Sequence, residues 1–105
     1  MSHYGISQIK WDSSHSFIEQ VKLHQVIKRE SGEFGLDEGT VKQFHETSSL
    51  INAGNKVYVL VPDGPGDFKL GDKVTVKTGQ QEFLESVNEM NQPTSALYDL
   101  VAWND

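Results

Sequence analysis

The chain has 105 residues, with 15 Asp and Glu against nine Lys and Arg for a formal net charge of −6, and it has no cysteine. A chain of this length is typical of one domain with a single core, so we expect residues 1–105 to form one domain. The lack of cysteine excludes disulfides and thiolate chemistry, and the acidic balance disfavours direct binding of nucleic acid through a basic face.

The N-terminus gives no sign of export. Residues 1–6 have no basic start followed by an apolar run, and the longest apolar run, Val57–Val61, is far too short to span a bilayer. We therefore expect a cytoplasmic protein with no membrane partner.

The first third of the chain predicts two strands. Ile6, Ile9 and Trp11 form a short apolar run with an imperfect period, which indicates a first strand. From Phe17 to Ile27 apolar residues at odd positions alternate with polar ones, which is typical of a half-buried second strand. Lys28–Gly39 then places three glycines among charged residues and predicts a loop.

A helix is predicted to follow this loop. Thr40 stands three residues before Gln43, which is the spacing of a capping box, so we expect the helix to start at Thr40. Gly54 is well placed to end it in a left-handed conformation. The apolar stripe of this helix consists of residues at helical spacing, namely Val41, Phe44, Ser48 and Ile51.

The middle of the chain predicts a central strand followed by a hairpin. Val57–Val61 is apolar on both faces, as expected of a strand at the centre of a sheet. Pro62–Asp67 is a turn-rich loop, because proline cannot donate a ladder hydrogen bond and glycine adopts unusual backbone angles. Lys73–Lys77 alternates, and Thr78–Gln80 provides a reversal before Gln81–Leu84, which predicts two antiparallel strands.

The C-terminal end predicts a second, shorter helix. Pro93–Ser95 precedes apolar residues at helical spacing, among them Leu97 and Leu100. The fold class expected from all these elements is α+β: a mostly antiparallel sheet of about five strands, one main helix and a short C-terminal helix. If the strands that flank the main helix pair directly, their connection should be a right-handed parallel crossover. The sequence pattern does not decide whether the sheet curls into a partly open barrel.

Five short segments, in order along the chain, carry a resemblance to a known family. They are Ser49–Gly54, Val57–Val59, Lys73–Val76, Glu82–Ser86 and Leu97–Leu100. Together they resemble a small bacterial family, the domain of unknown function 3892, which has a short helix ending in glycine, an apolar strand and a Val-x-Val strand. The chain departs from the family pattern at Glu85, where the family has arginine. The family has no established activity, so the resemblance implies an architecture only.

Four histidines raise the question of a metal site. His3, His15, His24 and His45 include no pair at the three- or four-residue spacing that would place two imidazoles on one helix face. A metal site or a small enzyme would need His24, His45 and a carboxylate such as Glu46 to converge from distant positions. We expect no metal and no cofactor.

The sequence carries no familiar catalytic motif. No Gly-x-Ser-x-Gly elbow, phosphate-binding Gly-Lys-Ser or His-Glu-x-x-His is present. The serines considered as nucleophiles are expected in turns or caps; they are Ser13, Ser14, Ser16, Ser48, Ser49 and Ser95. We therefore expect no catalytic residues and no enzyme activity.

The function that remains is protein binding. An acidic surface and two exposed loops favour a non-enzymatic accessory module that binds another protein. The candidate partner-binding residues are Glu30, Glu33, Asp37, Glu38, Asp63, Asp67 and Trp103. An alternative is an acidic inhibitor, of the kind carried by phages or mobile elements, that blocks a nucleic-acid-binding machine; a small metal protein or enzyme using His24 and His45 is a second alternative. The oligomeric state is left open.

Overall fold

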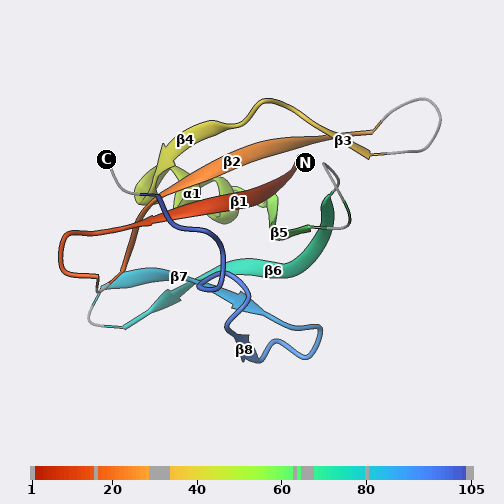
Figure 1. The fold of residues 1–105 in the computed structure, drawn as a ribbon. Coiled ribbons are helices and arrows are strands. Elements are labelled where there is room, and N and C mark those ends of the chain that lie inside the picture. The colour runs from red at the N-terminus through yellow and green to blue at the C-terminus, as the bar shows by residue number, and fades with distance from the viewer. Residues whose placement is uncertain are drawn as a thin grey trace.

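A computed structural model describes residues 2–15, 17–28, 34–62, 64, 68–79 and 81–103. Within these ranges the chain forms an eight-stranded sheet and one helix (Figure 1). In chain order the elements are β1 (His3–Trp11), β2 (Ile18–Lys28), β3 (Phe34–Leu36), β4 (Thr40–Gln43), α1 (Phe44–Asn52), β5 (Lys56–Pro62), β6 (Phe68–Thr78), β7 (Glu82–Val87) and β8 (Pro93–Thr94). The expected α+β domain with two helices and about five strands is therefore wrong. The domain is rich in sheet.

The strands lie in the order β3-β2-β1-β5-β6-β7-β8, and β4 also pairs with β2. β5 lies between β1 and β6, which confirms the prediction that Val57–Val61 is central. The predicted hairpin of β6 and β7 is also confirmed. β5 pairs in parallel with β1, whereas the other pairs are antiparallel, so the parallel neighbour of β5 is the first strand of the chain and not the second.

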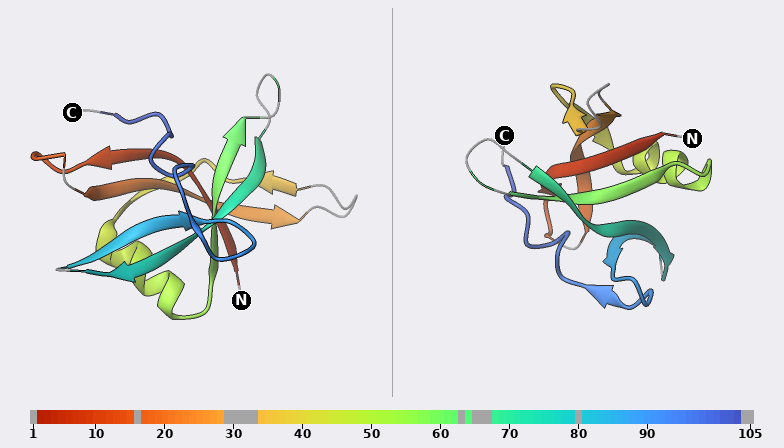
Figure 2. Two further views of the ribbon diagram at one scale, coloured as in Figure 1. Left: turned by 90° about the horizontal axis from the view of Figure 1, so that it is seen from below. Right: turned by 90° about the vertical axis from the view of Figure 1, so that its right-hand side faces the viewer.

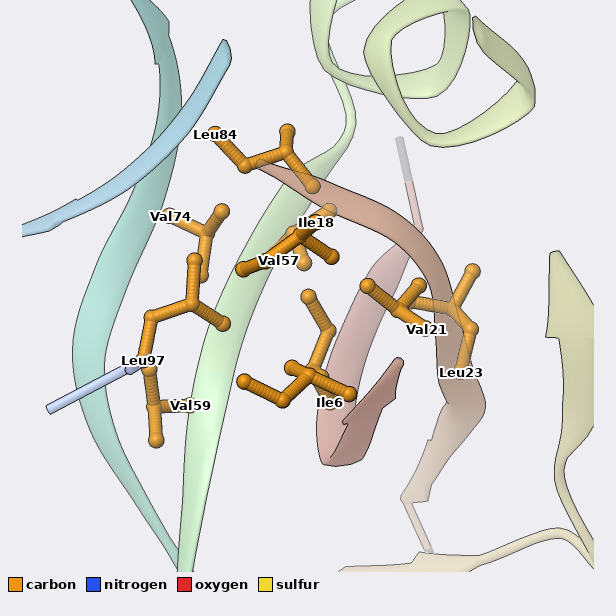
Figure 3. Packing of buried hydrophobic residues seen from close by; sticks show 10 residues of the cluster. Ile6, Ile18, Val21, Leu23, Val57, Val59, Val74, Leu84 and Leu97 are labelled. Atoms are coloured by element: carbon orange, nitrogen blue, oxygen red, sulfur yellow. The ribbon is translucent and has the colours of Figure 1, made fainter. Parts of the chain in front are cut away.

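The sheet curls around a single core. In Figures 1 and 2 the strands β1 and β2 lie opposite β6 and β7, with β5 between the two pairs. Figure 3 shows Val74 and Leu84 on one side of the core and Val21 and Leu23 on the other. Each such side chain contributes on the order of 2 kcal/mol when fully buried. Among the described residues the end strands β3 and β8 do not pair, so the curled sheet stays an open path.

A β-bulge explains the imperfect apolar period of β1. Ile6 and Ile9 are both fully buried although they are three residues apart. Opposite β2, the pairing shifts between Ile6 and Gln8, which leaves Ser7 as the extra residue. A bulge of this kind bends the strand and changes the direction in which the extra side chain points.

The helix begins later than predicted. Thr40–Gln43 is strand β4, which pairs with residues 20–23 of β2, and α1 starts at Phe44. The backbone amide of Gln43 donates a 3.0 Å hydrogen bond to Glu46 Oε1, so the capping box is displaced by three residues. Thr40–Gln43 thus pairs along the edge of β2 instead of forming one further helical turn. The predicted helix end is confirmed, since Gly54 has a φ of 97°.

The predicted loop over residues 28–39 contains a strand. Residues 34–36 form β3 and pair with residues 26–28 of β2, while residues 29–33 lie outside the described ranges. β3 and β4 thus lie one after the other along the same edge of β2. The turn at Asp37–Gly39 separates them.

The predicted C-terminal helix is wrong. Residues 95–100 form turns, although Leu97 is fully buried as the spacing suggested. The Leu97 amide donates a 3.1 Å hydrogen bond to Ser86 Oγ, and the chain then runs beside β1. There the Ile9 amide donates to the Val101 carbonyl and the Trp103 amide to the Ile9 carbonyl. These contacts tie the segment to β7 and β1.

Within the described ranges no helix has the length and apolar character needed to cross a bilayer.

Candidate functional site

A hollow of about 450 Å³ opens where β1 changes neighbours. Residues 3–6 of β1 pair with β5, whereas Ile9 takes the C-terminal segment as its neighbour. Polar side chains line one part of the hollow, namely Ser7, Gln8, Lys22, His24 and Asp99. The remaining wall is apolar and consists of Leu60, Pro62, Phe68, Leu100 and Val101. Ligand sites commonly have this mixture of an apolar wall and a few polar groups.

Ser7 and His24 form a hydrogen-bonded pair in this hollow. Ser7 Oγ lies 2.7 Å from His24 Nε2, although the two residues are 17 positions apart. The other ring nitrogen, Nδ1, lies 3.0 Å from the backbone carbonyl oxygen of Asp37. Both ring nitrogens are therefore engaged, and the side chain of His24 is only 13% exposed.

These partners determine which ring nitrogen carries the proton when the imidazole is neutral. A backbone carbonyl oxygen only accepts hydrogen bonds, so Nδ1 of His24 must carry the proton that it donates to Asp37. Nε2 is then an acceptor, and the hydroxyl of Ser7 donates to it. The arrangement leaves a basic nitrogen directly beside a hydroxyl oxygen.

The turn between β3 and β4 holds His24 in place. Asp37 Oδ1 accepts hydrogen bonds from the amides of Gln25, at 3.0 Å, and Gly39, at 2.9 Å. Gly39 has a φ of 85°, and a Cβ placed on it would lie 2.6 Å from Cε1 of the His24 ring. The ring thus packs directly on the glycine backbone. Only glycine satisfies both the backbone angle and this close approach.

Charged side chains of both signs lie around the pair. Asp37 Oδ1 lies 3.9 Å from His24 Nδ1, so a positive ring would interact with this carboxylate. Asp37 is 42% exposed, which weakens the interaction through solvent screening. Lys22 and Asp99 also line the hollow, and Asp99 accepts a 2.9 Å hydrogen bond from Ser95 Oγ. The hollow therefore contains both signs of charge.

A second, smaller hollow of about 260 Å³ lies beside an aromatic stack. The Trp11 ring stacks on Tyr98 at 5.6 Å and on His15 at 6.1 Å between centroids. The Tyr98 hydroxyl donates a 2.6 Å hydrogen bond to the Leu84 carbonyl. Burial raises the pKa of Tyr98 above its usual value of 10.0, and the nearby Glu85 carboxylate raises it further. This stack closes one end of the core.

The predicted partner-binding residues are only partly within the described ranges. Glu30, Glu33, Asp63 and Asp67 lie outside them. Asp37 and Glu38 are exposed in the turn that packs on His24, and the Asp37 carboxylate already accepts from the amides of Gln25 on β2 and Gly39 in the turn. Trp103 is half-buried beside β1.

The residues considered for a metal site do not gather where the structure describes them. Among the described residues, no group of three or more His, Cys, Asp and Glu side chains is placed to hold a metal ion. His45 is exposed on α1, whereas the His24 ring is bonded to Ser7 and Asp37.

Sequence reasoning overlooked Ser7. Its partner His24 lies on the neighbouring strand, and only the register of β1 against β2 brings the two together. The irregular spacing of Ile6 and Ile9 was the one available signal, because it indicates an extra residue between them. A bulge in a strand is common near functional sites.

Comparisons with known proteins add no relative to this picture. No family model, no curated protein and no solved structure matches the chain. The resemblance to the domain of unknown function 3892 stays a prediction.

Proposed function

We propose that this domain is a cytoplasmic accessory module that binds another protein, with the hollow receiving an apolar side chain of that partner. The observation that supports this most is the exposed apolar rim of the hollow. Phe68 is 47% and Val101 69% exposed, and both border a wall that contains the buried Leu60. Exposed apolar residues gathered at a concave site are typical of a recognition surface.

Charge favours a basic partner. The chain has a formal net charge of −6, and Asp99 lines the hollow itself. Asp37 and Glu38 are exposed in the turn that supports His24. Such charges increase the rate of encounter with a partner of opposite sign and make binding depend on salt.

The two alternative functions gain less support. An acidic inhibitor needs carboxylates gathered on one face, but most of the exposed acids of the described residues belong to separate elements. They are Glu19 on β2, Asp37 and Glu38 in the turn before β4, Glu82 on β7, Glu89 after β7 and Asp99 near the C-terminus. A metal protein would need ligands that converge, as His24 and His45 do not.

A capture experiment with a matched control tests the proposal. The immobilised domain is incubated with bacterial lysate in three forms: the wild type, the double variant Phe68→Ser and Val101→Ser, and the variant Met90→Ser. Met90 is 77% exposed but does not line the hollow, so its substitution removes a similar apolar group elsewhere.

We expect at least one protein to bind the wild type and Met90→Ser but not the double variant, and its capture to weaken as salt rises. Loss of that protein with the double variant alone indicates that the hollow makes the contact. If every captured protein binds all three forms equally, the proposal is wrong.

A further inference from the structure

We propose that Ser7 is a nucleophile that takes the acyl group of a small carboxylic ester, with His24 as the base that activates it. This inference goes beyond protein binding, because it assigns a reaction to the polar part of the hollow. It starts from the 2.7 Å contact between Ser7 Oγ and His24 Nε2.

A serine hydroxyl becomes a useful nucleophile when a base accepts its proton and a third group orients that base. His24 satisfies the first condition, because its Nε2 is the acceptor of the Ser7 hydroxyl. The Asp37 carbonyl oxygen, 3.0 Å from Nδ1, satisfies the second. The Asp37 carboxylate, 3.9 Å from the same nitrogen, would stabilise the imidazolium that forms when the proton moves.

The surroundings of Ser7 indicate the class of substrate. Leu60, Phe68 and Leu100 provide an apolar wall that suits a short acyl chain. Lys22 and Gln8 line the same hollow, and both carry N–H donors of the kind that stabilise a negatively charged oxygen. The fitting substrate is therefore an uncharged ester of a short aliphatic acid.

The proposed reaction consumes only the ester and one water molecule. Ser7 Oγ attacks the ester carbonyl carbon while its proton passes to His24 Nε2, which gives a tetrahedral oxyanion. The bond from carbon to the alkoxy oxygen then breaks, and His24 returns the proton to that oxygen, so an alcohol leaves and Ser7 is acylated. Water attacks the acyl carbon, gives its proton to His24, and releases the carboxylic acid as Ser7 regains its proton.

A bulge in β1 coincides with the proposed nucleophile. Ser7 is the extra residue between Ile6 and Gln8, and the strand changes neighbours at the same point. The bulge thus lies at the proposed nucleophile, as bulges often lie next to active sites.

Acylation by p-nitrophenyl butyrate tests the inference directly. The purified full chain is incubated with the ester, nitrophenol release is followed by absorbance, and the acylated peptide is identified by mass spectrometry. We expect a butyryl group on the peptide that contains Ser7, and a release rate at least tenfold above that of Ser7→Ala, in line with the effect of a positioned base.

Three further variants keep the test decisive. Ser7→Cys retains a nucleophile and should still be acylated at position 7, whereas His24→Gln should lose most of the rate. Ser49→Ala removes an exposed hydroxyl from α1 and should leave the rate unchanged. Thermal unfolding of each variant shows that it is folded. If wild type and Ser7→Ala are acylated equally, or if the acyl group lies only on lysines, the inference is overturned, whatever the result of the capture experiment.

Discussion

At the scale of single residues, the position of His24 depends on Gly39. The glycine combines a φ of 85° with a backbone that touches the imidazole ring. Gly64 has a similar φ of 93°, but a Cβ placed there would meet nothing within 4 Å. A substitution at Gly64 therefore introduces backbone strain alone, whereas one at Gly39 also disturbs the contact with His24.

We expect Gly39→Ala to destabilise the domain more than Gly64→Ala. Both carry the strain of a positive φ, on the order of 1–3 kcal/mol, but only Gly39→Ala must also displace the His24 ring. Urea unfolding of both variants gives the two changes in free energy. Equal losses would show that the ring does not pack on Gly39.

Tyr98 provides a prediction about pH. Burial and Glu85 raise the pKa of its phenol above 10.0, so the folded state keeps the proton longer than the unfolded state. The stability from this difference is fully present below pH 10 and is lost as pH rises through the folded pKa. Tyr98→Phe should cost about 1 kcal/mol at neutral pH by removing the bond to Leu84, and should flatten the alkaline decline. Unfolding free energies measured up to pH 11 check this; parallel curves would contradict it.

The pair of Ser7 and His24 shows where sequence reasoning stops at this scale. The sequence indicates the histidine but not its partner, because the contact depends on the register between two strands. Periodicity indicates which face a residue takes in a regular strand. It does not indicate where the side chain of a residue inserted by a β-bulge points.

At the scale of elements, the strand that precedes the helix shows how tertiary pairing overrides local signals. Thr40 and Gln43 have the spacing of a capping box, yet the free edge of β2 takes them as strand β4. The box then forms three residues later, with Gln43 and Glu46. The helix end at Gly54 was predictable because a left-handed glycine is a purely local feature.

Glu46 should therefore matter more to stability than an ordinary surface acid. Its carboxylate accepts a hydrogen bond from the Gln43 amide, and Glu46 Oε2 lies 3.8 Å from Lys42 Nζ. We expect Glu46→Ala to lower the free energy of unfolding by about 1 kcal/mol. The substitution removes the acceptor of the Gln43 amide and a favourable negative charge at the start of the helix. Glu46→Gln retains an acceptor and should cost less. Chemical unfolding of the two variants decides; equal losses would mean that the hydrogen bond contributes nothing.

At the scale of the whole molecule, the sheet was predictable at its centre and not at its ends. The apolar run of β5 and the reversal between β6 and β7 are visible in the sequence. The parallel pairing of β5 with β1, and the return of the C-terminal segment to β1, depend on contacts between distant parts of the chain. The apolar residues after Pro93 suggested a helix, but they serve the core from a series of turns.

Leu97 tests whether this irregular segment closes the core. It is fully buried and belongs to the central cluster, so Leu97→Ala should cost about 2–5 kcal/mol through lost contacts and a cavity. Val101→Ala, at a residue 69% exposed in the same segment, should change stability by less than about 0.5 kcal/mol. Thermal or urea unfolding measures both. A small loss for Leu97→Ala would mean that the segment is not part of the core.

The most direct test of this account is the tautomer of His24, because both the hollow and the proposed chemistry depend on how its ring is held. Long-range proton–nitrogen NMR spectra of the imidazole, recorded at about pH 8.5, where an ordinary imidazole is neutral, distinguish the two ring nitrogens. We predict a proton on Nδ1 and a bare Nε2 in the wild type, with the preference weakened in Ser7→Ala. A proton found on Nε2 would contradict the account, because Nδ1 could not then donate to Asp37 and the Ser7 hydroxyl would have no base.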